Sequence, residues 1–233
     1  MHIRKLIFRL IKVVLCFFLV VIFLQIVYMI ILKWVAPPIT ITQIVSYAIG
    51  NDVNKRYVSW GQISPAVKLA VISGEDAHFL RHHGFDFSSI SRQIQGWRKG
   101  KRLRGGSTLS QQVVKNVFLW QGGGWFRKGL ETYLTLMAEF VWGKRRIMEL
   151  YLNVVEMGNG IFGIEAVSQY YFHKPARDLT STEAALIVAT LPNPKKYTIH
   201  PFSPIVEYRY SYLLKKMRER IRQPEILKFL SAV

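Results

Sequence analysis

Residues 64–84 read SPAVKLAVISGEDAHFLRHHG, a helix start followed by two adjacent acids and three histidines. Ser64 before Pro65 is typical of a helix start, because it supplies a cap residue and a proline at the first helical position. Apolar residues then recur at helical spacing, at Val67, Ala70 and Val71. The stretch therefore predicts an α-helix that leads into the acids Glu75 and Asp76.

Spacing alone admits three interpretations of this acidic and histidine-rich end. In a metal site, His78 and His82 would lie four residues apart on one helix face. However, Phe79 stands where the zinc-protease motif needs Glu, and no distant Cys could close a site. In a helix cap, Glu75 and Asp76 would gain from the dipole of a helix N-terminus. In a catalytic face, Glu75, Phe79 and His82 would share one side of a helix. The spacing disfavours zinc and leaves the other two interpretations open.

The composition indicates a chain with one membrane anchor and one domain with a hydrophobic core. Half of its 233 residues are apolar, and 32 Lys and Arg against 14 Asp and Glu give a formal net charge of +18. Such a charge favours anionic partners, either nucleic acid or phosphate-bearing lipids. The topology predicted below places the domain where nucleic acid is scarce, so we expect lipids and no nucleic acid. A merely solubilising basic surface stays open on charge alone.

The anchor is predicted at residues 13–32, VVLCFFLVVIFLQIVYMIIL, which hold no charge and one polar amide, Gln25. About 20 apolar residues in a helix cross a bilayer core. A buried core helix would show a polar stripe. A cleaved signal peptide would have a shorter apolar region and a small-residue cleavage site. We therefore predict a retained transmembrane helix, preceded by a cytoplasmic basic tail at residues 1–12.

The residues that flank the anchor predict its orientation. Four bases precede it, at Arg4, Lys5, Arg9 and Lys12. Only Lys33 follows closely, so the positive-inside rule places the N-terminus in the cytoplasm and the later residues outside it. The one cysteine, Cys16, lies in the anchor, so the outer domain has no disulfide. We expect a juxtamembrane segment at 33–62 and the outer domain at 63–233.

Apolar periodicity predicts a mainly α fold for the outer domain. Helices are expected from Ser107 through the VVKNVFLW segment, over 126–151, over 163–172, from Ser181, and over about 206–222. Residues 39–57 fit either a linker or a short amphipathic segment. No alternation with period two persists for long, and the bases of 98–104 are typical of a solvated loop.

A second polar segment is GGSTLSQQVVKN, residues 105–116. Its glycines free the backbone, Ser107 and Thr108 offer a cap and donors, and the amides of a helix N-terminus bind phosphate. Gln111 and Lys115 are four residues apart and face the same way. A capped amphipathic helix with a polar face is the alternative, but the segment is unusually dense in polar groups for one.

Two further segments place charges on helices. In FRKGLE, Arg127 and Glu131 are at i and i+4, which fits either a surface ion pair or a second acid with cations beside it. KRRIMELYLNVVEMG, residues 144–158, puts Lys144, Glu149 and Asn153 in one helix, which alone would be read as structural.

Together, four segments in this order resemble the motifs of the peptidoglycan glycosyltransferases, glycosyltransferase family 51. EDAHFLRHHGFD, GGSTLSQQVVKN, RKGLE and KRRIMELYLN are similar to the family patterns EDxxFxxHxG, GGSTxxQQ, RKxxE and KxxILExYLN. RYSYLLKKM at 209–217 is a weaker fifth match, and Met148 in place of Leu is a conservative departure. The resemblance covers about residues 63–217. With no room for a transpeptidase domain after it, we expect the monofunctional form rather than a class A penicillin-binding protein.

This resemblance implies a lysozyme-like α fold and the polymerisation of lipid II in cell wall biosynthesis. The growing glycan on undecaprenyl pyrophosphate would be transferred, with inversion, to the GlcNAc 4-hydroxyl of lipid II, forming a β-1,4 bond. By resemblance, Glu75 is the base and Glu131 the second catalytic acid. The implied substrate-binding residues are Asp76, Phe79, His82, Ser107, Thr108, Gln111, Gln112, Lys115, Asn116, Arg127, Lys128, Lys144 and Asn153. Lys115, Arg127 and Lys128 would stabilise the pyrophosphate, and His78 and His83 are expected to be bystanders.

The implied partners are lipid II, nascent glycan strands, the membrane, and other cell-wall synthesis or division proteins. The implied location is the bacterial inner membrane, with a periplasmic catalytic domain. The sequence requires no cofactor; the family varies in its need for a divalent cation such as Mg²⁺ or Mn²⁺, and no motif fixes a metal site. A membrane-anchored muramidase and an inactive scaffold are the alternatives. The cation-rich segments favour transfer, because a pyrophosphate leaving group needs cations where hydrolysis needs an acid.

Overall fold

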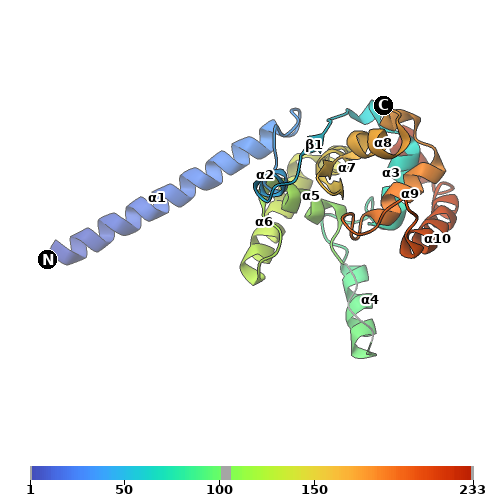
Figure 1. Ribbon diagram of the computed structural model, residues 1–233. Helices are drawn as coiled ribbons and strands as arrows, with labels where there is room; N and C mark the ends of the chain where they lie inside the picture. Colours follow the sequence, from blue (N-terminus) through green and yellow to red (C-terminus); the bar gives the residue numbers. More distant parts are fainter. Residues whose placement is uncertain (1, 101–105, 232–233) are drawn as a thin grey trace. The chain divides into compact units, whose positions relative to one another are not determined.

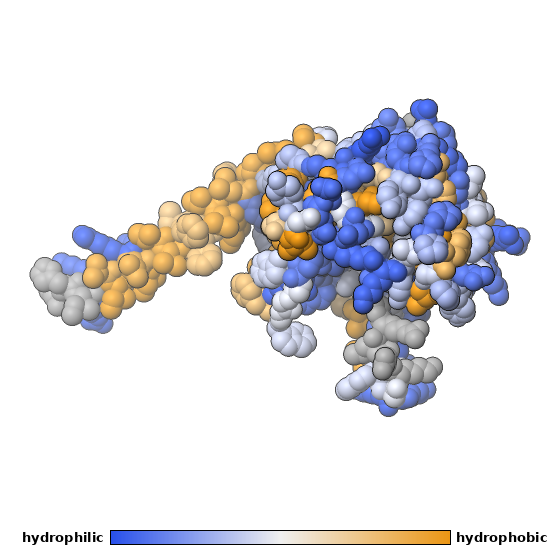
Figure 2. Space-filling model, viewed as in Figure 1, coloured by the Kyte–Doolittle hydropathy of each residue, from blue (hydrophilic) through white to orange (hydrophobic). Residues whose placement is uncertain are grey.

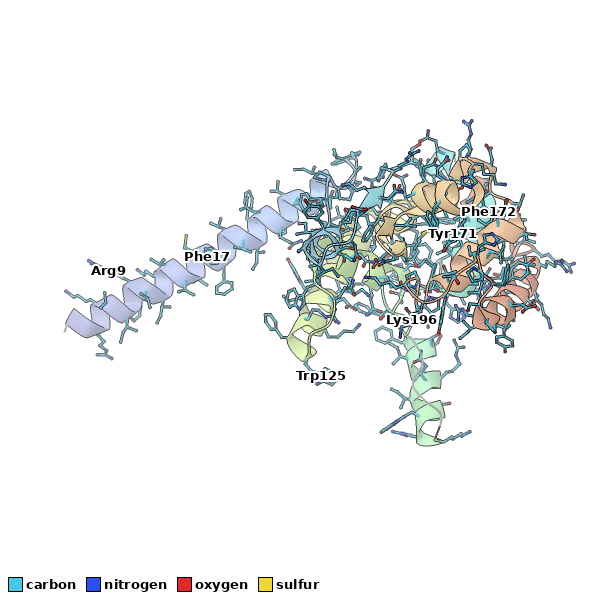
Figure 3. The ribbon with its side chains drawn as sticks, viewed as in Figure 1. Arg9, Phe17, Trp125, Tyr171, Phe172 and Lys196 are labelled. Carbon is cyan, nitrogen blue, oxygen red and sulfur yellow. The ribbon has the colours of Figure 1, made fainter. Side chains whose placement is uncertain are left out.

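The computed structural model describes residues 2–100 and 106–231, and its contacts divide the chain into two units, 1–37 and 38–233. The first unit is the helix α1 (His2–Ile31), whose side chains from residue 4 to 24 are largely exposed and mostly apolar (Figures 1 and 2). Figure 3 shows Arg9 and Phe17 projecting outward from it. Residues 4–31 are long and apolar enough to cross a membrane, which agrees with the predicted anchor.

The second unit consists mainly of helices, so the predicted mainly α fold is confirmed (Figure 1). Its helices are α2 (Ile41–Ala48), α3 (Pro65–Gly74), α4 (Phe87–Arg98), α5 (Leu109–Phe118), α6 (Trp125–Val141), α7 (Gly143–Val154), α8 (Ile164–Phe172), α9 (Ser181–Thr190), α10 (Pro204–Arg220) and α11 (Pro224–Ser231). Two 3₁₀ turns lie at Trp60–Gln62 and Ala176–Asp178.

The helices of this unit pack in two groups around the loop that follows α3. In the first group α3 packs against α9, α10 and α11, and in the second α5 packs against α6 and α7. The helices α3 and α9 are apolar on most sides and largely buried, as expected of helices that other elements surround. Because α3 and α5 lie in different groups, the loop between them connects the two.

A small sheet was not expected from the sequence. It has the order β1-β3-β2, where β1 (Asn54–Lys55) pairs in parallel with β3 (Ile161–Phe162), and β3 pairs antiparallel with β2 (Glu156–Gly158). Strands of two or three residues are too short to show an alternating pattern. Gly160 has φ +70°, and a Cβ there would lie 2.1 Å from the carbonyl oxygen of Asp52, so the sheet needs glycine at this position.

Two helix predictions are wrong in their extent. The helix that begins at Pro65 ends at Gly74, and residues 75–84 form turns, so Glu75, Phe79 and His82 do not share a helix face. Polar side chains in this stretch bond to one another and to backbone groups instead of continuing the helix. The single helix expected over 126–151 is two helices, α6 and α7, because the chain turns at Gly143 with φ +69°.

Two helices, α4 and α11, were missed, whereas α2 agrees with the short amphipathic segment that was one of the two interpretations of residues 39–57. The helix α4 has apolar residues at helical spacing, at Phe87, Ile90, Ile94 and Trp97, which were overlooked among polar neighbours, and α11 has only eight residues. The second unit begins at Pro38, so residues 38–62, which were predicted as part of a juxtamembrane segment, belong to the same compact unit as residues 63–233. Most of the basic loop expected at 98–104 lies outside the described residues.

Candidate active site

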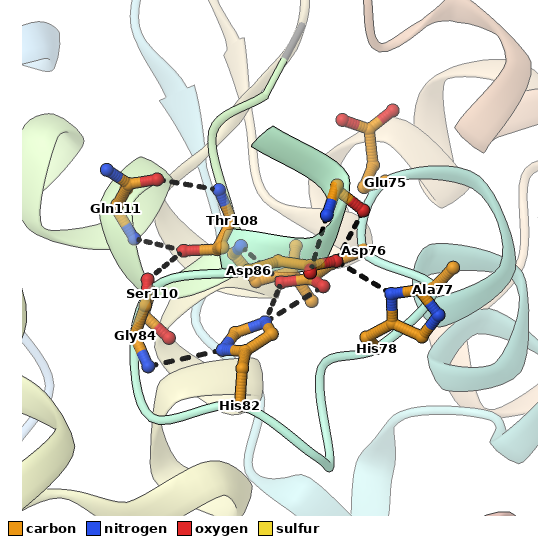
Figure 4. A network of polar contacts seen from close by, with 12 residues as sticks. Glu75, Asp76, Ala77, His78, His82, Gly84, Asp86, Thr108, Ser110 and Gln111 are labelled. Carbon is orange, nitrogen blue, oxygen red and sulfur yellow. Dashed lines mark hydrogen bonds and ion pairs between the residues drawn. The ribbon is translucent and has the colours of Figure 1, made fainter. Parts of the chain in front are cut away.

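Glu75 caps the C-terminal end of α3 and points away from the other polar groups of its loop (Figure 4). Its side chain is 14% exposed. The side-chain amide of Gln112 donates to its carboxylate at 3.3 Å, and a guanidinium nitrogen of Arg209 lies 4.0 Å away. Burial raises the pKa of Glu75 above its ordinary 4.5, and the charge of Asp76 adds to this, while Gln112 and Arg209 oppose it. The carboxylate is thus shielded, lightly held and more basic than an exposed one.

Asp76 points the opposite way and is fully engaged (Figure 4). Its carboxylate accepts the backbone N–H of Leu109 at 2.9 Å and is 2.9 and 3.0 Å from Nε2 of His82. The bond to Leu109 places this carboxylate at the N-terminus of α5, where a negative charge is stabilised. The helix-cap interpretation therefore applies to Asp76, but this residue stabilises the N-terminus of α5 and not α3, the helix that precedes it in the chain.

His82 completes the closure of the loop. Its Nδ1 accepts the backbone N–H of Gly84 at 3.2 Å, so the hydrogen bonds assign the proton to Nε2, which donates to Asp76. The hydroxyl of Thr108 donates to the carbonyl of Gly84 at 2.6 Å. Gly84 has φ +91°, and a Cβ there would lie 2.8 Å from the Thr135 methyl group, which explains the glycine. The loop is thus fixed to the start of α5 at two points.

The two histidines that the metal interpretation paired, His78 and His82, bond to different carboxylates. Nδ1 of His78 lies 2.7 Å from Asp86, which caps α4, whereas His82 bonds to Asp76. Burial would raise the pKa of Asp86, but hydrogen bonds from Ser88, Ser89 and His78 outweigh it and hold that pKa well below its usual range. Within residues 2–100 and 106–231, no group of three or more His, Cys, Asp or Glu could hold a metal ion.

The helix α5 carries the next part of the site. Thr108 and Gln111 form a capping box at its start, so these two side chains serve the helix end. Gln112 contacts Glu75, and three residues further along, Lys115 faces the second acid. Burial lowers the pKa of Lys115, Glu131 raises it, and the neighbouring cations lower it. In the part of the chain that the structure describes, Lys115 has no ion-pair partner within 4 Å.

Glu131 lies on α6, only 2% exposed, and is held by two cations. A guanidinium nitrogen of Arg127 donates to one carboxylate oxygen at 2.7 Å, and the ammonium of Lys128 pairs with the other. The charge of Glu131 also acts on Lys115 and raises its pKa. We call Lys115, Arg127 and Lys128 the cation cluster. It presents three positive charges around one buried negative charge, a surplus suited to an anionic ligand.

Other predicted binding residues make contacts within the fold. The side-chain amide of Asn153 exchanges hydrogen bonds with the backbone of Val58, and Asn116 accepts from Gln121 at 3.1 Å. Lys144 pairs with Glu139 at 2.7 Å and covers the fully buried ring of Phe79 at 4.7 Å. Ser107 is exposed at the edge of the described residues.

Two residues near Glu75 had no assigned role in the sequence analysis. Arg209 stands at the start of the weaker fifth motif and reaches Glu75 from α10. Tyr151, in the YLN segment of α7, is fully buried, and its hydroxyl has no partner among the described residues. Burial and the nearby charges of Glu75 and Asp76 raise its pKa far above 10.0. Both residues lie within the quoted motifs, but only the structure shows that they are near Glu75.

The described residues combine a shielded carboxylate, Glu75, with a cluster of cations that holds a second acid, in a chain that also carries a helix long and apolar enough to cross a membrane. A family model described as Transglycosylase matches residues 42–218. The match covers well over half of the chain, so the chain belongs to the transglycosylase family, and the resemblance drawn from the motifs is confirmed.

Curated relatives agree with this family. A biosynthetic peptidoglycan transglycosylase of Haemophilus influenzae is 44% identical over 214 residues, covering 88% of this chain and 85% of the relative. Proteins with the same description from Mannheimia succiniciproducens and Escherichia coli are each 49% identical. These two alignments cover 71% and 72% of this chain and 68% and 70% of the relatives.

Proposed function

We propose that the chain, a peptidoglycan transglycosylase of cell wall synthesis, polymerises lipid II. In this proposal the growing glycan on undecaprenyl pyrophosphate is the donor and the GlcNAc 4-hydroxyl of lipid II is the acceptor. The transfer inverts the anomeric carbon, forms a β-1,4 bond and releases undecaprenyl pyrophosphate. The motif order, the family match and the relatives' descriptions support this substrate class.

One observation carries the proposal: α5 connects a shielded acid to the cation cluster. Gln112 contacts Glu75, and Lys115 faces Glu131 three residues later. A base and a phosphate-binding position that are reached from one helix suit a reaction in which a hydroxyl attacks one side of an anomeric carbon and a pyrophosphate leaves the other.

Glu75 is the proton acceptor in this scheme. As the acceptor oxygen forms its bond to the anomeric carbon, the hydroxyl proton moves to the Glu75 carboxylate. A sugar hydroxyl is a very weak acid, so a carboxylate whose pKa is raised by burial is the better base. Asp76 is bound to His82 and Leu109 and points away, which leaves Glu75 as the acid of the pair that can receive a proton.

The cation cluster stabilises the leaving group. As the glycosidic C–O bond breaks, its electron pair stays with the pyrophosphate, and charge-assisted contacts to phosphate are strong. Glu131 holds Arg127 and Lys128 in place rather than taking a proton, because both of its oxygens are already paired. Lys115 has no such partner within the described residues and is the cation that a phosphate would engage.

The surface of α6 suits a lipid-borne substrate. Trp125, Phe126 and Phe140 are 92%, 76% and 90% exposed on the helix that carries Glu131, and Figure 3 shows Trp125 at its end. Exposed aromatic groups of this kind mark lipid or partner contacts. Single-pass anchoring in the bacterial inner membrane, with a periplasmic domain, fits this substrate, and cell-wall or division proteins are the proposed protein partners. No step is assigned to a divalent cation.

Purified protein and labelled lipid II test the proposal. We expect polymeric glycan that lysozyme digests. Untouched lipid II with cleavage of preformed glycan would instead establish a muramidase, because hydrolysis needs only water as the acceptor. No reaction with either substrate would establish a scaffold without activity.

A further inference from the structure

The last helix of the chain packs onto the loop that carries Glu75. The family match ends at residue 218, whereas Arg220 and α11 follow it. Nevertheless, residues 220–229 contact the segment 77–81, which begins two residues after Glu75. These contacts connect a segment outside the matched region to the proposed base.

The aromatic contact centres on Phe229. Its ring lies edge-on to Trp60 at 5.2 Å and to Phe79 at 6.2 Å. Phe79 is fully buried, and its ring lies edge-on to His82 at 6.3 Å. His82 in turn bonds to Asp76, so packing continues from α11 to the residue next to Glu75.

Two polar contacts hold the same segment. A guanidinium nitrogen of Arg220 donates to the carbonyl oxygen of Ala77 at 2.9 Å. Arg81 pairs with Glu225 of α11 at 2.7 and 2.8 Å. Ion pairs as exposed as this one contribute little, whereas the bond to Ala77 fixes a peptide two residues from Glu75.

We propose that Arg220 and Phe229 are positioning residues that hold the Glu75 loop in its reactive geometry. The inference rests on the proposed role of Glu75 as the base. The loop ends in α3 on one side and Gly84 on the other, and between them it has no helical hydrogen-bond ladder of its own. The shape of the loop therefore depends on contacts with residues of other elements. Arg220 and Phe229 supply such contacts from the C-terminal part of the chain.

The expected effect follows from how exposed Glu75 is. The groups that face it are Asp76 of the loop, Gln112 of α5, Tyr151 of α7 and Arg209 of α10. If the loop loosens, water reaches the carboxylate and its pKa falls towards the ordinary value. A displacement of about 1 Å costs on the order of 100-fold in rate in sensitive cases, so a partial loosening should cost less.

The experiment uses the full chain with Phe229→Ala and Arg220→Ala. Matched controls are Leu227→Ala, an exposed apolar residue of α11, and Arg222→Ala, an exposed arginine two positions after Arg220. For lipid II polymerisation we expect kcat to fall about 10-fold, on the scale of a misplaced catalytic group, with KM within twofold. The acidic limb of the pH–rate profile should move to lower pH. Phe229→Leu and Arg220→Lys should restore most of the rate.

Variants that match their controls would overturn the inference. So would a loss of kcat with an unmoved acidic limb, because that indicates a smaller folded fraction. If Phe229→Ala does not fold, Arg220→Ala beside its control Arg222→Ala decides by the same readouts. A Glu75→Gln variant that keeps the wild-type rate would refute the proposed base itself. An inactive Glu75→Gln beside fully active Arg220→Ala and Phe229→Ala would refute only the positioning role.

Discussion

Glu75 and Glu131 are the same residue type in two opposite surroundings. Glu75 ends a helix, receives one amide hydrogen bond and lies 4.0 Å from one guanidinium. Glu131 lies within a helix, with one carboxylate oxygen paired to Arg127 and the other to Lys128. The first carboxylate is free to take a proton, and the second is committed to its cations. The comparison teaches that, between two shielded carboxylates, the partners separate a group that can take a proton from one that holds cations.

The largest effect is expected for Glu75→Gln. Losing a general base costs roughly 10²–10⁴-fold in rate, and the amide keeps the shape of the side chain. We expect lipid II polymerisation to fall by at least about 100-fold on that scale, while a lipid II analogue still binds. A rate above about a tenth of the wild type would remove Glu75 from the role of base.

Glu131→Gln should reduce both activity and stability. The substitution leaves Arg127 and Lys128 beside a neutral amide, and unpairing buried charges costs on the order of 2 kcal/mol when one cation is partly exposed. That cost lowers Tm by roughly 4–8 °C for a chain of this size. Calorimetry would measure it, with the exposed Glu207→Gln as control. An unchanged Tm would mean that the ion pairs contribute nothing, and would weaken the contrast with Glu75.

Lys115→Ala should mainly affect the anionic part of the substrate. Loss of a charge-assisted phosphate contact of about 1.5–3 kcal/mol lowers kcat/KM by roughly 10–100-fold. The kcat/KM of Lys115→Arg should lie between those of the wild type and Lys115→Ala. Because burial lowers the pKa of Lys115, its charge and the wild-type rate should be lost earlier on the alkaline side than for an exposed lysine. Steady-state kinetics with the exposed Lys215→Ala as control would check this. Unchanged affinity and rate would exclude the pyrophosphate role.

The sequence predicted the class of fold and singled out Glu75 and Glu131, but it did not predict the surroundings of these two acids. Apolar periodicity indicated α3, α5, α8, α9 and α10 because each buries a stripe or more of side chains. The helical face assumed for Glu75, Phe79 and His82 was wrong, since the stretch bends to bond with α5, whose residues lie some 30 positions away. No local pattern can show such a contact. For the same reason the sequence could not show the hydrogen bonds that Asn116 and Asn153 make within the fold.

The smallest expected effect is a change in the Tm of Glu75→Gln, which again compares Glu75 with Glu131. The pKa of Glu75 is higher in the folded than in the unfolded protein, because burial disfavours its charged form. The neutral carboxyl therefore stabilises the fold at pH values below the unfolded pKa, and this stabilisation is lost as pH rises through the folded pKa. Glu75→Gln removes this loss. Its Tm should therefore exceed the wild-type Tm at neutral pH, by less than Glu131→Gln lowers it, and should approach the wild-type Tm near pH 4. A lower Tm than wild type at neutral pH would contradict the shielded, lightly held state of Glu75.

The pH dependence of the polymerisation rate tests the central claim most directly. A base must be deprotonated to act, so the wild-type rate should fall as pH drops through the pKa of Glu75, with a midpoint above 4.5. The residual rate of Glu75→Gln should lack this limb, and that of Glu131→Gln should keep it. A wild-type rate that stays constant down to pH 4.5, or the same limb in Glu75→Gln, would contradict the assignment of Glu75 as the base.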